Sequence, residues 1–301
     1  MSQVIFNIIF TPHTVRCLLP FAESIQRHND VDIRLVSNNC SEKEDLQLKS
    51  KATNSECYHY YKVNTNKILQ HHEVLNELYN IEEGHYFCFM DSDIFCNDCF
   101  LPFYLEKLEY SSAVFACKPI LESPLSPEIN KLQGRHFHDR NNRLIGGSYF
   151  AIYKRTAIEQ AKQSLGFLFD RKDWNELNKN LQSKLEAKNM VYERYDTGKL
   201  LNFTILENGG QLDYHEHPNL FHIGGVSWND SLIEQNAKKP SFPNNLLGDV
   251  LRRRQKVAKY FSDFIAHCLD NTEIPDVPQL SQSENEKLKE VSMALRKLYH
   301  S

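Results

Sequence analysis

The sequence lacks the features that mark membrane-spanning, secreted and nucleic-acid-binding proteins. No apolar run approaches the ~20 residues that a membrane-spanning helix needs. The start, MSQVIFNIIF, has neither the basic residues nor the small-residue cleavage site of a signal peptide, so we expect a cytoplasmic protein. The net charge of -4 argues against a nucleic-acid partner.

Cysteines are present but follow no metal-binding or disulfide pattern. The eight cysteines are scattered, several of them in strand-like runs, and we expect free thiols in a reducing compartment. Cys96 and Cys99 form a single Cys-x-x-Cys, and no second pair accompanies it at a spacing known for zinc sites. The length of 301 residues and the 41% hydrophobic content fit one large domain with an appendage.

Expected strands and helices alternate along most of the chain. We predict strands over residues 4–10, 31–36, 57–63, 86–90, 113–118, 149–153 and 220–223. We predict helices over residues 15–27, 42–51, from Asn64 or Thr65 to Tyr79, and over 100–110, 156 onwards, 171–190 and 199–207. This alternation predicts an α/β fold with a doubly wound, mostly parallel sheet. Residues 119–143 show no period, and we expect a mobile, functional loop there.

The C-terminal part differs in composition from the rest. After a Pro/Asn-rich break at residues 240–245, we expect amphipathic helices over 247–269 and 283–300. We therefore predict a domain over 1–245 and a C-terminal helical extension over 246–301. The 247–269 helix has an apolar and a basic face, as interfacial helices do. Two hypotheses follow: peripheral contact with the inner face of a membrane or with a partner, or ordinary packing on the sheet.

Two aspartates follow the clearest buried-strand pattern. Tyr86 to Met90 are apolar without a break, and Asp91 and Asp93 come next. Strand alternation would point both carboxylates the same way at the carboxyl end of the strand, where open α/β sheets bind ligands. Paired carboxylates are costly to bury without a cation. A divalent metal such as Mg²⁺, carrying a substrate diphosphate, would satisfy both carboxylates, although Asp-x-Asp by itself is as easily a plain polar turn at the end of a strand.

The spacing around these aspartates resembles the GT-A glycosyltransferases, most closely their inverting, family-2-like branch. The match runs without a gap through the motif Asn76-x7-Gly84-x-Tyr86-x2-Phe89-x-Asp91-x-Asp93. Three further likenesses are weaker. Gly146-Gly147-Ser148 resembles the glycine turn on the acceptor side, and Asp196-Thr197-Gly198 resembles the helix start near the family's catalytic base. His222, followed by Gly224-Gly225, resembles a late histidine that binds the metal in many members.

The resemblance covers roughly residues 1–230 and departs from the family at three points. Leu78 replaces a small residue, the arginine that often precedes Asn76 is absent, and Tyr195-Asp196 stands where related enzymes often have a Glu-Asp pair. The resemblance implies a GT-A, Rossmann-like fold. It also implies a nucleotide-sugar half over about 1–118 and an acceptor half over 119–245.

The resemblance also implies a function and a set of site residues. The implied function is metal-dependent transfer of a hexosyl or N-acetylhexosaminyl group from a nucleotide-diphosphate sugar, of which a UDP-sugar is favoured. The acceptor would be a hydroxyl of a glycan or of a lipid-linked molecule, and the transfer would invert the anomeric configuration. Such transfer serves glycan, polysaccharide or lipopolysaccharide synthesis. We expect Asp91, Asp93 and His222 to bind Mn²⁺ or Mg²⁺, and Asp196 to be the general base. The expected donor-binding residues are Thr11, His13, Asn38, Lys67, His71, Asp91, Ser92, Gly146 and Gly147.

Simpler roles and other functions stay open. His222 is equally explained as a structural histidine, and Asp196 as a helix N-cap. A haloacid-dehalogenase-type phosphatase would use Asp91 as its nucleophile, although that family carries its Asp-x-Asp after the first strand. A nucleotidyltransferase would share the sheet but normally opens with a glycine-rich loop, unlike TPHTVRC. A non-catalytic sugar-nucleotide-binding module would need no general base.

Overall fold

The computed structural model describes residues 4–116, 138, 142, 145, 149–226 and 249–300, except for the side chains of 249–254. The predicted loop over 119–143 therefore lies outside the described residues, apart from His138 and Asn142. Gly146, Gly147 and Ser148 lie outside them as well.

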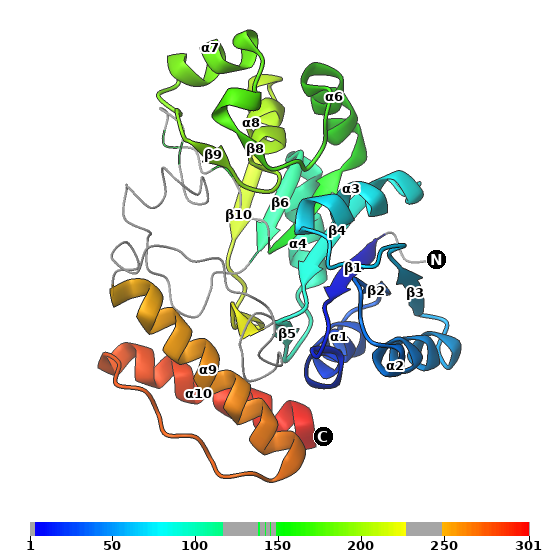
Figure 1. The fold of residues 1–301 in the computed structure, drawn as a ribbon, viewed down its shortest axis with the longest axis vertical. Coiled ribbons are helices and arrows are strands. Elements are labelled where there is room, and N and C mark those ends of the chain that lie inside the picture. Colours follow the sequence, from blue (N-terminus) through cyan, green and yellow to red (C-terminus); the bar gives the residue numbers. More distant parts are fainter. Residues whose placement is uncertain are drawn as a thin grey trace.

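A seven-stranded sheet forms the centre of the described structure, in the order β10-β6-β7-β4-β1-β2-β3 (Figure 1). Strand β7 is antiparallel to its neighbours β4 and β6, and every other neighbouring pair is parallel. The predicted doubly wound, mostly parallel α/β sheet is therefore confirmed. The strand bounds are β1 Ile5–Phe10, β2 Asp32–Ser37, β3 Tyr58–Lys62, β4 Tyr86–Asp91, β6 Ala113–Ala116, β7 Phe150–Lys154 and β10 Leu212–His215.

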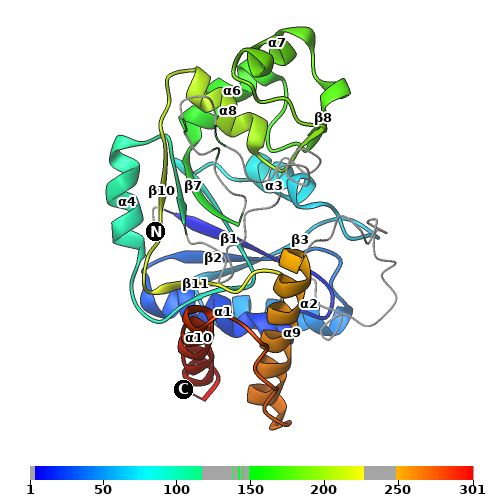
Figure 2. The ribbon, with the colours of Figure 1, turned by 90° about the vertical axis from the view of Figure 1, so that its left-hand side faces the viewer.

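Helices cover both faces of the sheet (Figure 2). One hydrophobic cluster joins the sheet to α1 (Val15–His28), α4 (Leu101–Tyr110), α9 (Asp249–Asp270) and α10 (Gln282–His300). A second cluster joins the other face to α3 (His71–Ile81), α6 (Arg155–Leu165), α7 (Lys179–Ala187) and α8 (Lys199–Glu207). Strand alternation divides the apolar residues, since Cys88 and Met90 of β4 belong to the first cluster and Phe87 and Phe89 to the second. Helix α2 (Glu42–Thr53) covers β2 and β3.

Helix α3 begins later than predicted. It starts at His71, because the side chain of Glu73 accepts a hydrogen bond of 2.7 Å from the backbone N–H of Gln70 and caps the first turn. Upstream, the amide group of Asn38 pairs with the backbone of Leu69, accepting from its N–H at 3.0 Å and donating to its C=O at 2.9 Å. The long-range pairing keeps Leu69 out of the helix.

The predicted helix over 171–190 is only partly correct. Lys172–Asp173 forms strand β8, which pairs with β9 (Arg194–Tyr195), and a 3-10 turn over Trp174–Glu176 precedes α7. The guanidinium of Arg194 donates two hydrogen bonds to the carboxylate of Asp173 and holds this ladder together. A contact between residues 21 positions apart thus outweighs the helical propensity of this charged segment.

The C-terminal helices pack on the sheet domain. Phe261, Phe264 and Ile265 of α9 are buried in the same cluster as Phe21 of α1, and the hydroxyl of Tyr299 on α10 donates to the backbone C=O of Cys17. The predicted helical appendage is therefore confirmed. The described apolar residues of α9 are used internally, as the packing hypothesis expects, and contact with a membrane or a partner stays a prediction. None of the described helices is long and apolar enough to span a membrane.

Candidate active site

A strand, a turn and a short hairpin bring the predicted metal ligands together. Strand β4 ends at Asp91, Ser92 and Asp93 form a turn, and β5 (Ile94–Cys96) pairs antiparallel with β11 (Leu220–His222), so that Ile94 lies opposite His222. The two carboxylates therefore converge through a turn, and the prediction that strand alternation aligns them is wrong. The β5–β11 pairing delivers the histidine from 129 residues further along the chain.

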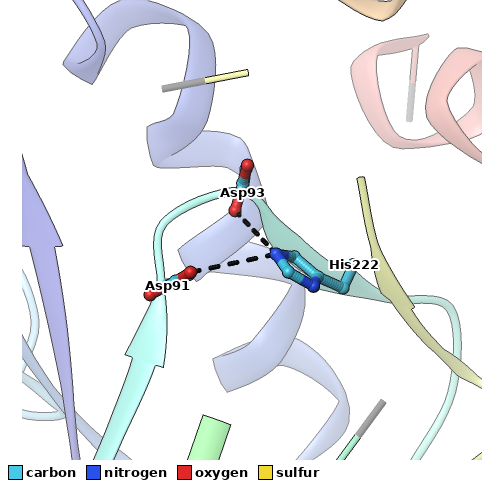
Figure 3. Close-up of side chains that lie close together, drawn as sticks. All are labelled: Asp91, Asp93 and His222. Atoms are coloured by element: carbon cyan, nitrogen blue, oxygen red, sulfur yellow. Dashed lines mark ion pairs between the residues drawn. The ribbon is translucent and has the colours of Figure 1, made fainter. Parts of the chain in front are cut away.

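The three side chains form one compact cluster (Figure 3). Nε2 of His222 lies 3.4 Å from Oδ1 of Asp93 and 3.8 Å from Oδ2 of Asp91. One ligand atom from each residue lies within 4.8 Å of the others. Asp93 and His222 are buried, whereas the side chain of Asp91 is 36% exposed and forms the open side of the cluster.

Asp93 is held in the ionised form. Burial would raise the pKa of Asp93, but the hydrogen bond and charge of His222, together with the N–H of Val226 at 3.2 Å from Oδ2, lower it below the usual range. The backbone C=O of Asp93 also accepts the N–H of Ile223 at 3.2 Å. Asp93 is therefore fixed at both its carboxylate and its backbone by the segment that follows β11.

Asp91 carries an unfavourable charge. Burial, the charge of Asp93 and the charge of Asp196 raise the pKa of Asp91 well above its usual range. A cation between the carboxylates would offset all three effects. The negative charge of Asp196 is the smallest of the three causes.

The site lies where the chain reverses its direction across the sheet. From β1 the chain runs to β2 and β3 on one side, and it returns to β4 on the other. Asp91 is paired in register with Ile9, so the aspartates stand at the carboxyl ends of β1 and β4. Crevices at such switch points are the usual ligand sites of open α/β sheets.

Asp196 follows strand β9 and precedes α8. The N-cap of α8 is Gly198, with φ of 72°, and no side chain caps the helix. The carboxylate of Asp196 instead accepts the N–H of Thr197 at 2.9 Å. The N-cap interpretation of Asp196 is therefore wrong, although the predicted helix start at Lys199 is confirmed.

His71 lies beside the cluster as the first residue of α3. Its Nε2 is 4.0 Å from Oδ1 of Asp91, and its ring meets Phe89 edge-on with centroids 5.6 Å apart. Burial lowers the pKa of His71 to about 4, against the opposing charge of Asp196. A neutral imidazole therefore lies beside Asp91.

The other predicted donor residues surround the same edge of the sheet. Thr11 and His13 lie in the turn after β1, Lys67 is exposed before α3, and Ser92 is buried between the aspartates. The amide of Asn38 is already occupied by Leu69, which gives it a structural role in holding the Lys67 segment. Gly146 and Gly147 lie outside the described residues.

Tyr149 is a site residue that the sequence interpretation missed. Its ring stacks on His222 with centroids 4.6 Å apart, its C=O accepts the N–H of Asp91 at 2.6 Å, and its hydroxyl bonds to that of Tyr214. Contacts of this kind orient the first ligands of a metal. The signal in the sequence is an aromatic residue directly after Gly146-Gly147-Ser148.

The donor set fits a divalent cation. Two carboxylates and one imidazole nitrogen face one another, and carboxylate oxygens are the preferred ligands of Mg²⁺ and Mn²⁺. The three side chains leave the remaining coordination positions to water or phosphate oxygens on the exposed side of Asp91.

No protein-family model matches the chain, and no curated protein matches it in sequence. Similar solved structures include the mannosyltransferase PcManGT from Pyrobaculum calidifontis in complex with GDP-Man and Mn²⁺, at 13% identity and a TM-score of 0.47, over 98% of this chain and 81% of that one. TarS 1-349 from S. aureus matches at 13% identity and 0.46, over 99% and 86%. The 4-diphosphocytidyl-2C-methyl-D-erythritol synthase from Anaerococcus prevotii matches at 10% identity and 0.40, over 70% and 86%.

Proposed function

We propose that this protein is a metal-dependent glycosyltransferase that uses a nucleotide-diphosphate sugar. The observation that carries the proposal is the convergence of Asp91, Asp93 and His222 at the switch point of the sheet. Paired carboxylates at that position need a cation, and a diphosphate is the ligand class that shares such a cation with protein carboxylates. We favour Mn²⁺ as the cation and a UDP-sugar as the donor.

The diphosphate would enter from the exposed side of Asp91. A cation bound there neutralises charge on the leaving diphosphate as the glycosidic bond breaks. Lys67 and His71 border the same opening, at the carboxyl ends of the strands, and would contact phosphate oxygens. The nucleoside would lie along the ends of β1 and β2, near Thr11 and His13.

Asp196 is proposed as the general base. An acceptor hydroxyl attacks the anomeric carbon, the new C–O bond forms as the bond to the diphosphate breaks, and the hydroxyl proton passes to Asp196. A single displacement of this kind inverts the anomeric configuration. The proposal is supported by the carboxylate of Asp196 lying outside the α8 cap and by the effect of its charge on the pKa of Asp91. The acceptor would be a glycan or lipid-linked hydroxyl.

The haloacid-dehalogenase alternative is disfavoured by the position of Asp91. It ends β4, the fourth strand of the chain, whereas that family carries its nucleophile after the first strand. A nucleotidyltransferase and a non-catalytic binding module would both bind a metal and a nucleotide, so the reaction products distinguish them from a glycosyltransferase. Release of a nucleoside diphosphate with sugar transfer supports the proposal; release of pyrophosphate supports a nucleotidyltransferase.

A thermal-shift panel tests the proposal. UDP, GDP and dTDP are each added with and without Mn²⁺, because a ligand that binds only the native state raises its melting temperature. We expect one nucleotide to stabilise the protein in the presence of Mn²⁺ and much less in its absence. No metal-dependent shift with any of the three would contradict the proposal.

A further inference from the structure

The segment after β11 lies between the metal cluster and helix α9. Gly224 and Gly225 have φ of 73° and 86°, in the left-handed region that favours glycine. This double turn allows the N–H of Ile223 to reach the backbone of Asp93 and the N–H of Val226 to reach its carboxylate, each at 3.2 Å. His222, at the end of β11, is one predicted metal ligand, and the segment that follows it fixes Asp93, a second one.

Helix α9 packs directly against the turn. A β-carbon placed on Gly225 would lie 3.6 Å from Cβ of Ala258, which is ordinary van der Waals contact. Val226 is fully buried in the same cluster as Val257 and Phe261 of α9. Figures 1 and 2 both show the first half of α9 beside the end of β11.

Ala258 itself is buried and small. Its exposed fraction is 7%, so a larger side chain there has to displace either the core or the glycine turn. The turn lies beside Ala258, and its two glycines have no side chains. Any shift of the turn moves the N–H of Val226 away from Asp93 and moves His222 with it.

We infer that α9 is a positioning element for the metal site, acting through the contact of Ala258 with Gly225. The C-terminal helices thus do more than cover the sheet, because they set the distance between His222 and Asp93. The inference deepens the proposed function and rests on it, since the ligand positioned is the divalent cation. Metal affinity should therefore respond to substitutions in a helix that supplies no ligand.

The test compares two identical substitutions in the full chain. Ala258→Leu enlarges the contact with the turn, and Ala161→Leu enlarges a buried alanine of α6 in the cluster on the other face of the sheet. Mn²⁺ affinity is measured from free Mn²⁺ by electron paramagnetic resonance, without nucleotide. We expect Ala258→Leu to weaken Mn²⁺ binding about 10–100-fold, the range seen when partners of metal ligands are changed. Ala161→Leu should stay within about twofold of the unsubstituted protein.

Hydrogen exchange of residues 220–226 gives a readout that needs no metal. Loss of the Val226 hydrogen bond should speed exchange in metal-free Ala258→Leu and leave Ala161→Leu unchanged. If Ala258→Leu does not fold, Ala258→Val is used and should show a smaller change in the same direction. Equal changes in both leucine variants, or none in a folded Ala258 variant, overturn the inference. Absence of Mn²⁺ binding in the unsubstituted protein would refute the proposed function instead, and hydrogen exchange would still decide whether α9 holds the turn.

Discussion

Replacing Asp93 with asparagine should abolish metal-dependent nucleotide binding and leave the fold intact. Asn keeps the shape of the side chain and an oxygen that accepts the Val226 N–H, so the turn after β11 is retained. It removes the charge that faces Nε2 of His222 at 3.4 Å in a buried position. The substitution thus separates the metal role of Asp93 from its structural one.

The expected size of the effect follows from ligand linkage. A ligand at 100 times its Kd stabilises the native state by about 2.7 kcal/mol. For a chain of this size, about 2 °C of melting temperature per kcal/mol gives a shift of roughly 5 °C. If the variant binds about 100-fold more weakly, the same concentration equals its Kd, and the stabilisation falls to about 0.4 kcal/mol, or roughly 1 °C.

The assay is the melting shift with Mn²⁺ and whichever nucleotide binds the unsubstituted protein. Asp45→Asn is the matched control, because Asp45 is also buried but bonds to Lys62 and Tyr60, away from the metal cluster. The control should keep the full ligand shift from a lower starting temperature. A full shift in Asp93→Asn would refute the assignment of Asp93 as a metal ligand.

Three further predictions concern the base, the support of His222 and acid stability. Asp196→Asn should lower kcat about 10²–10⁴-fold with little change in donor affinity, and the product should have inverted configuration. Normal turnover of Asp196→Asn, together with an inactive Glu193→Gln or Asp213→Asn variant, would assign the general base to that other residue. Tyr149→Leu removes the ring that stacks on His222 and should weaken Mn²⁺ binding about tenfold, whereas Tyr149→Phe keeps the ring and should bind within about threefold of the unsubstituted protein. Burial raises the pKa of Asp45, but hydrogen bonds from Lys62 and Tyr60 lower it overall, so its stabilisation is present above pH ~4 and lost as the pH falls through the folded pKa. Asp45→Asn should therefore cost about 1–2 kcal/mol at pH 7 and progressively less as the pH falls below about 4, measured by urea unfolding; a loss that does not change with pH would contradict it.

The sheet and one half of the site follow from local sequence patterns. The apolar run from Tyr86 to Met90 predicts a buried strand, because a strand in a covered parallel sheet needs apolar residues on both faces. The strand is confirmed, and with it the place of Asp91 at its carboxyl end. Alternating strands and helices then place that end at the ligand edge of the sheet. Each of these steps uses contacts between residues close in sequence.

The remainder depends on contacts that no local pattern encodes. Asn38 binds the backbone of Leu69 and shortens α3, and Arg194 binds Asp173 and replaces part of a predicted helix with a strand. His222 meets Asp93 only because β11 pairs with β5. Short strands of this kind have weak intrinsic preferences, so their pairing is decided by the packed structure. The resemblance of the late histidine to a family pattern predicted that His222 joins the two aspartates, but neither it nor the composition predicted the strand pairing that brings them together.

Two of the five described non-glycine residues with a left-handed backbone lie beside the proposed site, as do two glycines; the other three non-glycine residues are Asn142, Asn189 and Asn271. His13 and Asn39, with φ of 69° and 62°, lie in the turns that follow β1 and β2, and Gly224 and Gly225 follow β11. A left-handed conformation costs a residue other than glycine about 1–2 kcal/mol, so it persists only where the surrounding structure imposes it. These positions gather at the carboxyl edge of the sheet, beside the unfavourable charge of Asp91. Strain and uncompensated charge at one edge are what a preorganised ligand site requires, because binding a cation and a diphosphate there offsets costs that the fold alone leaves in place.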